Sequence, residues 1–336
     1  MQFETVYFYT TKYVMNLTRA LSQLLLREFK ILTSGIICDV AVSRDDVLRN
    51  RGNPTELMFI LIPQLLVTSK ESVPDPNKYC LYQLEQLNDK SGGAATVATN
   101  VKTKFDSLMI AAIMGSITSY DYSEINLKYY PETLLSKVCV LPPPVYLTSG
   151  MSAALYKSDA AYKSDILFYG GMNPRRDRIL SQIMDPLQRV YGYKIMIVNR
   201  VFGEELLNYI FNTRVVLNIH YYANSILETD RIHAALQFNH VKLVSEYPTQ
   251  RDALLPIYKT HCDRILFCDE ISEKFVNTSQ LIKVCVSALL PSLPSLPSPQ
   301  PFAASASAIV APLTATLNAL CAAEIRRSGV SSIYHR

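Results

Sequence analysis

Residues 165–171 read DILFYGG, and they begin a series in which strand-like and helix-like segments alternate as far as residue 270. The predicted strands are DILFYGG (165–171), KIMIVNR (194–200), RVVLNIHYY (214–222), VKLVSEY (241–247) and DRILFCDE (263–270). The helices predicted between them span residues 175–192, 203–212, 225–239 and 251–262, with Pro186 expected to interrupt the first. Strict alternation predicts a parallel sheet joined by right-handed crossovers, and therefore an α/β fold.

The first half of the chain is less regular. Its first predicted element is a helix, because five apolar residues recur at helical spacing: Val14, Leu17, Leu21, Leu24 and Leu25. Two strands are predicted next, at residues 31–40 and 57–62. The three prolines at 142–144 can continue neither a helix nor a central strand, so they are expected to end a folded unit.

These segments divide the 336-residue chain into two domains and a tail. The predicted boundaries are an N-terminal domain over 1–146, a linker over 147–163, a C-terminal domain over 164–285 and a Pro/Ser/Ala-rich tail over 286–336. The tail contains PSLPSLPSPQPFAASASAIVAP (291–312), whose low complexity is typical of an extended or disordered segment.

Composition excludes several classes of function. The net charge of +4, from 33 Lys+Arg against 29 Asp+Glu, is too small to attract nucleic acid in bulk. The seven cysteines form no CxxC pair, and with the five histidines they complete no zinc pattern, so neither a disulfide framework nor a metal site is expected. No signal peptide or transmembrane segment is expected, and the predicted location is the cytoplasm, of the host if the protein is viral.

The first candidate site follows the strand at 165–171. Gly170 and Gly171 allow backbone to approach a ligand closely, and the helix that begins after them favours an anion at its exposed N–H groups. Arg175 and Arg176 add fixed positive charge that can pair with phosphate oxygens. The alternative is a simple turn followed by a solvated basic helix start.

The second candidate site follows the strand at 214–222. Asn218 and His220 lie at the end of this strand, and Asn224 or Ser225 can cap the next helix. Glu228 and Arg231 are three residues apart, and a carboxylate near this helix start can accept both hydroxyls of a ribose. The alternative is an intrahelical ion pair beside a histidine of the core.

Three further carboxylates complete the candidates. Glu246 ends the strand at 241–247, while Asp121 and Glu124 lie in SYDYSEIN (119–126) of the first half. Asp121 or Glu124 can act as a general base if it faces an interdomain cleft. The alternative for each is an ordinary surface carboxylate.

Several segments together carry a resemblance to a known family over about residues 55–270. They are KYCLYQLEQ, SYDYSEIN, LPPPV, DILFYGGMNPRRDRIL, VVLNIHYY, LETDRIHAAL and VKLVSE. In this order they resemble glycosyltransferases of the GT-B superfamily, particularly the glycosyltransferase-like proteins of large DNA viruses. The resemblance implies two Rossmann-like domains facing a cleft, with the nucleotide-sugar donor in the C-terminal domain and the acceptor in the N-terminal domain.

The resemblance also implies roles for individual residues. Gly170, Gly171, Arg175 and Arg176 would approach the diphosphate, and Glu228 would bind the ribose. Residues bordering the donor sugar and phosphates would be Asn218, His220 and the helix start at Ser225, with Arg231 and Glu246 beside them. In an inverting mechanism Asp121 or Glu124 would deprotonate the acceptor.

The function expected from this resemblance is sugar transfer from a UDP- or GDP-sugar to a hydroxyl of a glycan or glycoprotein. No permanently bound cofactor or metal is expected, because helix dipoles and basic side chains neutralise the leaving diphosphate. The alternative function is a non-catalytic GT-B-like protein that binds a nucleotide sugar or a partner.

Overall fold

The computed structural model places the chain in two compact units that divide between strands β6 and β7. It describes residues 5–26, 32–37, 56–61, 63, 79–87, 107–143, 163–222, 225–247, 263–268 and 278–289. Of the predicted linker, only Lys163 is among these residues. The described residues also do not include Asn224, the predicted helix at 251–262 or the chain beyond 289.

The first unit contains a parallel sheet with the strand order β2-β1-β3-β4-β5-β6. Its strands are β1 (Thr5–Thr10), β2 (Leu32–Ile37), β3 (Glu56–Leu61), β4 (Tyr79–Gln83), β5 (Ser119–Asp121) and β6 (Val138–Val140). Its helices are a 3₁₀ turn (Lys12–Val14), α1 (Met15–Leu24), α5 (Ser107–Gly115), α6 (Glu124–Leu127) and α7 (Glu132–Leu135). The predicted helix near residues 14–25 is therefore confirmed as α1.

Strand β1 is an element that the sequence patterns did not predict. It lies between β2 and β3, and Val6 and Phe8 are fully buried. TVYFYT has no alternation of apolar and charged residues, so it lacks the signal by which half-buried strands are found. The sequence pattern of KYCLYQLEQLN does not predict strand β4 either, and the five residues of this strand are all buried.

The second unit contains a parallel sheet with the strand order β11-β10-β9-β7-β8. Its strands are β7 (Ser164–Tyr169), β8 (Ile195–Val198), β9 (Thr213–Asn218), β10 (Lys242–Glu246) and β11 (Ile265–Cys268). Its helices are α8 (Pro174–Asp185), α9 (Gly203–Phe211), α10 (Thr229–Leu236) and α12 (Thr278–Leu289). All five predicted strands are present, and the α/β class with two Rossmann-like units is confirmed.

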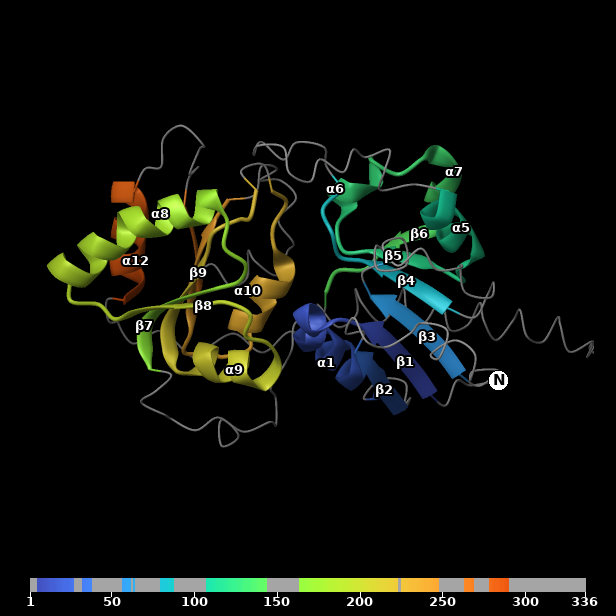
Figure 1. The fold of residues 1–336 in the computed structure, drawn as a ribbon, viewed down its shortest axis with the longest axis horizontal. Helices are drawn as coiled ribbons and strands as arrows, with labels where there is room; N and C mark the ends of the chain where they lie inside the picture. Colours follow the sequence, from blue (N-terminus) through green and yellow to red (C-terminus); the bar gives the residue numbers. More distant parts are fainter. Residues whose placement is uncertain are drawn as a thin grey trace, which may run out of the picture. The chain divides into compact units, whose positions relative to one another are not determined.

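Helices cover both faces of the second sheet (Figure 1). One core joins the sheet to α9 and α10 through side chains such as Val216, Leu207 and Ile232. The other core joins it to α8 and α12 through Val215, Ile183 and similar side chains. Strand order reverses between β7 and β9, since β8 lies on one side of β7 and all later strands lie on the other. In open α/β sheets, ligands bind beyond the carboxyl ends of the strands at such a reversal.

Two helix boundaries refine the sequence prediction. Helix α8 ends at Asp185 and gives way to a π-type turn over Pro186–Val190, as expected where proline removes a backbone N–H. Helix α12 was not predicted, and the proposed start of the tail at 286 falls inside it. Ala288 and Leu289 are buried in the core shared with α8, so the folded unit continues at least to Leu289.

In the part of the chain that the structure describes, no helix combines the length and the apolar character that crossing a bilayer requires.

Candidate functional site

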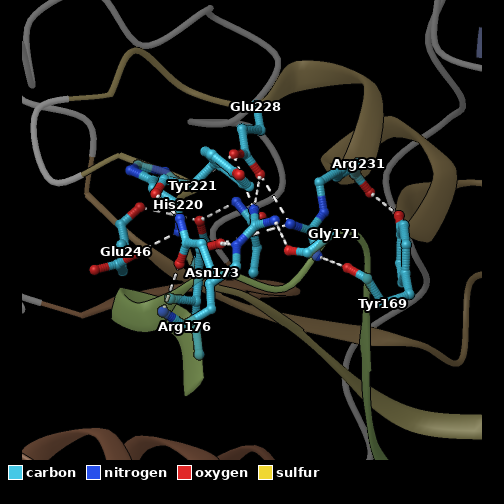
Figure 2. A network of polar contacts seen from close by, with 12 residues as sticks. Tyr169, Gly171, Asn173, Arg176, His220, Tyr221, Glu228, Arg231 and Glu246 are labelled. Atoms are coloured by element: carbon cyan, nitrogen blue, oxygen red, sulfur yellow. Dashed lines mark hydrogen bonds and ion pairs between the residues drawn. The ribbon is translucent and has the colours of Figure 1, made fainter. Parts of the chain in front are cut away.

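The predicted donor-site residues of the second unit meet at the carboxyl ends of β7, β9 and β10 (Figure 2). The turn after β7 contains Gly170, whose φ of +121° strongly favours glycine. A Cβ atom at this position would lie 3.4 Å from the Arg231 guanidinium. Glycine is therefore favoured here by the backbone conformation, while a side chain at this position would be in ordinary van der Waals contact with the arginine.

Helix α8 begins directly after this turn, and its first residues are held by Asn173. The Asn173 side chain accepts a hydrogen bond from the Arg176 backbone N–H at 2.8 Å, and Pro174 has no N–H to offer. The helix start therefore provides fewer free donors for an anion than the sequence suggested. Positive charge at this edge comes mainly from arginine side chains.

Arg176 and Arg231 converge on one carboxylate, that of Glu228. Arg176 Nη2 lies 3.0 Å from both carboxylate oxygens, and Arg231 Nη1 lies 2.9 Å from Oε2. The Tyr221 backbone N–H donates to Oε1 at 2.9 Å. These four bonds use the roughly four acceptor positions of a carboxylate. Ribose binding by Glu228 stays a prediction, and in this arrangement it would require at least one of these bonds to open.

Arg176 is almost fully enclosed, and its guanidinium joins three segments. Besides Glu228, it donates from Nε to the Ile219 carbonyl at 2.9 Å and from Nη1 to the Gly171 carbonyl at 2.7 Å. Its charge also lies 5.1 Å from the centre of the Tyr221 ring. Because all three guanidinium nitrogens are engaged, Arg176 fixes the geometry of this edge rather than offering free donors to a ligand.

A second buried ion pair joins α8 to β10. Both Arg175 Nη atoms contact the Glu246 carboxylate, one of them at 3.1 Å, and Arg175 also donates to the His220 carbonyl at 2.8 Å. The Glu246 carboxylate in turn accepts a hydrogen bond from the His220 backbone N–H. The pair therefore holds the end of β9 against β10.

Burial and ion pairing set the charges of this cluster. Burial alone would raise the pKa of Glu228, but the Arg231 and Arg176 guanidinium groups outweigh it and the pKa falls to about 2. Burial lowers the pKa of Arg176 to about 10, so Arg176 is still charged at pH 7. Burial also lowers the pKa of His220, which favours its neutral form.

The bonded members of the cluster therefore carry unequal charge. Among the described residues, three guanidinium groups (Arg175, Arg176, Arg231) face two carboxylates (Glu228, Glu246), which leaves one net positive charge. Asp230 lies next to Arg231 in α10, and burial raises its pKa to about 6 against the effect of that arginine. The local charge is thus near balance above pH 6 and positive below it, so at pH 7 any attraction for an anion comes from the individual guanidinium groups and not from a net charge.

Two buried polar atoms at the end of β9 have no hydrogen-bond partner within the described part of the chain. They are Asn218 Oδ1 and His220 Nε2, and both residues are at most 1% exposed. The Asn218 amide nitrogen is satisfied by Ser245 Oγ at 3.0 Å. Buried polar atoms normally find a partner, so these two are positioned for a ligand group or a water molecule.

The contacts described above bring together nine of the ten predicted donor-site residues, and Ser225 differs from its predicted role. The prediction that Asn224 or Ser225 caps the next helix is wrong for Ser225, because α10 begins at Thr229 and Glu228 occupies the cap position. Asn224 lies outside the described residues. Ser225 is buried, and the chain reaches α10 in a non-helical conformation that turns Glu228 toward the arginines.

Two residues of this edge were missed by sequence reasoning. Asn173 caps α8 and also donates to the Tyr221 carbonyl at 2.6 Å. An asparagine followed by proline at a helix start is a recognised signal, so Asn173 could have been found. Tyr221 follows β9 without any pattern that distinguishes it from its neighbour Tyr222.

The two predicted bases occupy different environments in the first unit. Asp121 is fully buried at the end of β5, where its oxygens accept hydrogen bonds from the Ser123 N–H, the Asn126 amide and the Tyr130 hydroxyl. Glu124, the first residue of α6, is exposed. Asp121 therefore holds a local network, whereas Glu124 is open to solvent.

Burial of Asp121 is expected to make the stability of the first unit depend on pH. Burial raises the pKa of Asp121 to about 7, although the hydrogen bonds from Ser123, Tyr130 and Asn126 act in the opposite direction. A raised carboxyl pKa means that the folded state holds its proton while the unfolded state has lost it. We expect the free energy of unfolding to decrease as the pH rises from about 4 to about 7. The decrease is at most about 1.4 kcal/mol per pH unit.

Urea unfolding at pH 5 and pH 7.5 measures this dependence. Asp121→Asn is expected to reduce the difference between the two pH values, because the titrating group is gone. Glu124→Gln, three positions away and exposed, is the matched control and should keep the wild-type difference. An unchanged pH dependence in Asp121→Asn would show that another group is responsible.

Comparisons with known proteins add the following findings. No protein-family model and no curated protein matches the chain. It is similar to the solved structure of AviGT4, a glycosyltransferase involved in avilamycin A biosynthesis, with 11% identity, a TM-score of 0.48, and coverage of 95% of this chain and 98% of that one.

Two further solved structures are similar over most of their length. One is Alr3699/HepE of Anabaena in complex with UDP and glucose, with 9% identity, a TM-score of 0.49, and coverage of 96% of this chain and 95% of that one. The other is UDP-GlcNAc 2-epimerase of Methanocaldococcus jannaschii in complex with UDP-GlcNAc and UDP. It has 11% identity, a TM-score of 0.47, and coverage of 93% of this chain and 99% of that one.

Proposed function

We propose that the second unit binds a nucleotide-sugar donor at the carboxyl edge of its sheet, and that the protein transfers the sugar to an acceptor hydroxyl. The observation that carries this proposal is the convergence of Arg175, Arg176 and Arg231 on the strand reversal between β7 and β9. A nucleoside diphosphate is the anion that such a charged edge of an α/β sheet suits best.

In this proposal the diphosphate lies against the Gly170–Gly171 turn, close to the arginines. Arg175 and Arg231 have side chains that are 10% and 13% exposed, so they are better placed to meet a ligand than the more enclosed Arg176. Asn218 Oδ1 and His220 Nε2 are buried, so they would contact a hydroxyl or phosphate group through a bound water molecule. Fixed guanidinium charge would stabilise the diphosphate as it leaves the sugar.

The acceptor hydroxyl needs a base, and Glu124 is the better of the two predicted residues. Its side chain is exposed and open to an acceptor, whereas the Asp121 oxygens are occupied by three neighbouring groups. We propose a glycan or a glycoprotein as the acceptor.

A panel of UDP- and GDP-sugars tests the function directly. The protein is incubated with each donor, with and without a broad acceptor mixture, while nucleotide release and the melting temperature are measured. We expect one donor to raise the melting temperature and to release its nucleotide when the acceptor is present.

The other outcomes assign other functions. Stabilisation without release would indicate a non-catalytic nucleotide-sugar-binding protein. A change in the donor sugar that needs no acceptor, seen by NMR, would indicate an isomerising enzyme. The absence of any stabilisation across the panel would overturn the proposal.

A further inference from the structure

The Tyr221 side chain is an exposed aromatic surface at the edge of the arginine cluster. It is 38% exposed, although it follows directly after the buried His220 at the carboxyl end of β9. Its ring lies over the glycine turn, since a Cβ atom on Gly171 would be 3.8 Å from Tyr221 Cε2. An aromatic ring is thus placed beside the part of the site where the diphosphate is proposed to bind.

Both the backbone N–H and the backbone carbonyl of Tyr221 are hydrogen-bonded. Its N–H donates to Glu228 Oε1 at 2.9 Å, and its carbonyl accepts from Asn173 Nδ2 at 2.6 Å. These two residues belong to different elements, α8 and α10, that both begin at this edge. The backbone position of the ring is therefore fixed before any ligand arrives, which lowers the entropy lost on binding.

The ring itself is also oriented by contacts. The Arg176 guanidinium lies 5.1 Å from its centroid, and the Tyr222 ring is nearly perpendicular to it, with centroids 4.9 Å apart and an interplanar angle of 78°. Figure 2 shows Tyr221 beside Arg176 and Glu228. These contacts leave more than a third of the residue open to solvent, in contrast to the enclosed groups around it.

We propose that Tyr221 is the platform on which the nucleobase of the donor stacks. This inference rests on the proposed function, since it requires a nucleotide in the site. A planar base has an extended π face, and stacking of a base on an aromatic side chain is a strong contact that tolerates any base. Tyr221 would thus set affinity for the nucleoside part of the donor, while the arginines set affinity for the diphosphate.

Calorimetric titration with UDP and with inorganic pyrophosphate separates these two contributions. Stacking on an aromatic ring contributes about 1–3 kcal/mol, so Tyr221→Leu is expected to raise the Kd for UDP by roughly 5- to 150-fold. Its Kd for pyrophosphate should stay within about twofold of wild type. Tyr221→Phe keeps the ring and should bind UDP as the wild type does.

Tyr191→Leu is the matched control, because Tyr191 is similarly exposed but lies before β8, at the opposite edge of the same sheet. It should leave both Kd values unchanged. An equal loss of UDP and pyrophosphate binding in Tyr221→Leu would overturn the inference, since Tyr221 would then act only by holding Arg176.

Unchanged UDP binding in Tyr221→Leu would also overturn the inference. If this variant bound a UDP-sugar more weakly but UDP as well as the wild type does, Tyr221 would stack on the sugar and not on the base. Failure of the proposed function is distinguishable from all of these. In that case the wild-type protein would bind neither UDP nor pyrophosphate.

Discussion

Glu228→Gln is expected to lower the free energy of unfolding of the second unit by about 3–5 kcal/mol. The substitution keeps the size of the side chain but removes the charge that Arg176 and Arg231 share. Both guanidinium groups are largely buried, and an unpaired buried charge is much more costly than a lost surface ion pair. Urea unfolding followed by circular dichroism measures the change.

Glu205→Gln is the control for this substitution. Glu205 is exposed in the first turn of α9, so its loss should cost no more than about 1 kcal/mol, the usual size of a helix-dipole interaction. Equal effects of the two substitutions would contradict the assignment of Glu228 as the centre of the cluster.

Glu228→Gln is also expected to change how stability depends on pH in the acid range. Because the folded pKa of Glu228 is lowered to about 2 from 4.5, its stabilisation is complete above pH 4.5 and is lost as the pH falls toward 2. We expect the wild type to lose stability across this range, and Glu228→Gln to lose less of it.

Arg176→Lys is expected to destabilise the second unit by about 2–4 kcal/mol, although it keeps the positive charge. A lysine ammonium cannot reach the Gly171 carbonyl, the Ile219 carbonyl and both Glu228 oxygens at once, as the planar guanidinium does. The affinity for UDP should fall as well, because the turn and the end of β9 lose their common anchor.

Thermal unfolding with and without UDP measures both effects. Arg178→Lys is the control, since Arg178 lies two residues further along α8 with an exposed side chain. It should change the melting temperature and the shift caused by UDP by very little. If Arg176→Lys behaved like Arg178→Lys, the positive charge alone would explain the stability and the UDP affinity. The hydrogen bonds of the Arg176 guanidinium would then be unimportant for both.

The second unit could be predicted from sequence because its pattern is local. Each strand there is a short apolar run followed by turn residues and a helical segment, and Pro186 marks where α8 ends. Strand β1 was missed because TVYFYT has no alternation of apolar and charged residues, the pattern that reveals a half-buried strand.

The candidate site could be predicted only in part. Residues at the ends of strands β7, β9 and β10 were identified because parallel strands bring their carboxyl ends to one edge. Their pairing was not predictable, since Arg175 and Glu246 are 71 positions apart and Arg176 and Glu228 are 52 apart. The start of α10 was misplaced for the same reason, because the Glu228 side chain is bound by Arg176, 52 positions away, as well as by Arg231 in its own helix.

Hydrogen–deuterium exchange of the full chain with and without UDP tests the central claim, that a nucleoside diphosphate binds at the arginine cluster of the second unit. We expect UDP to slow amide exchange in residues 169–176, 218–222 and 228–231, which form the edge of the sheet around the cluster. Protection confined to the first unit, or no protection at UDP concentrations that saturate other nucleotide-sugar proteins, would contradict the claim.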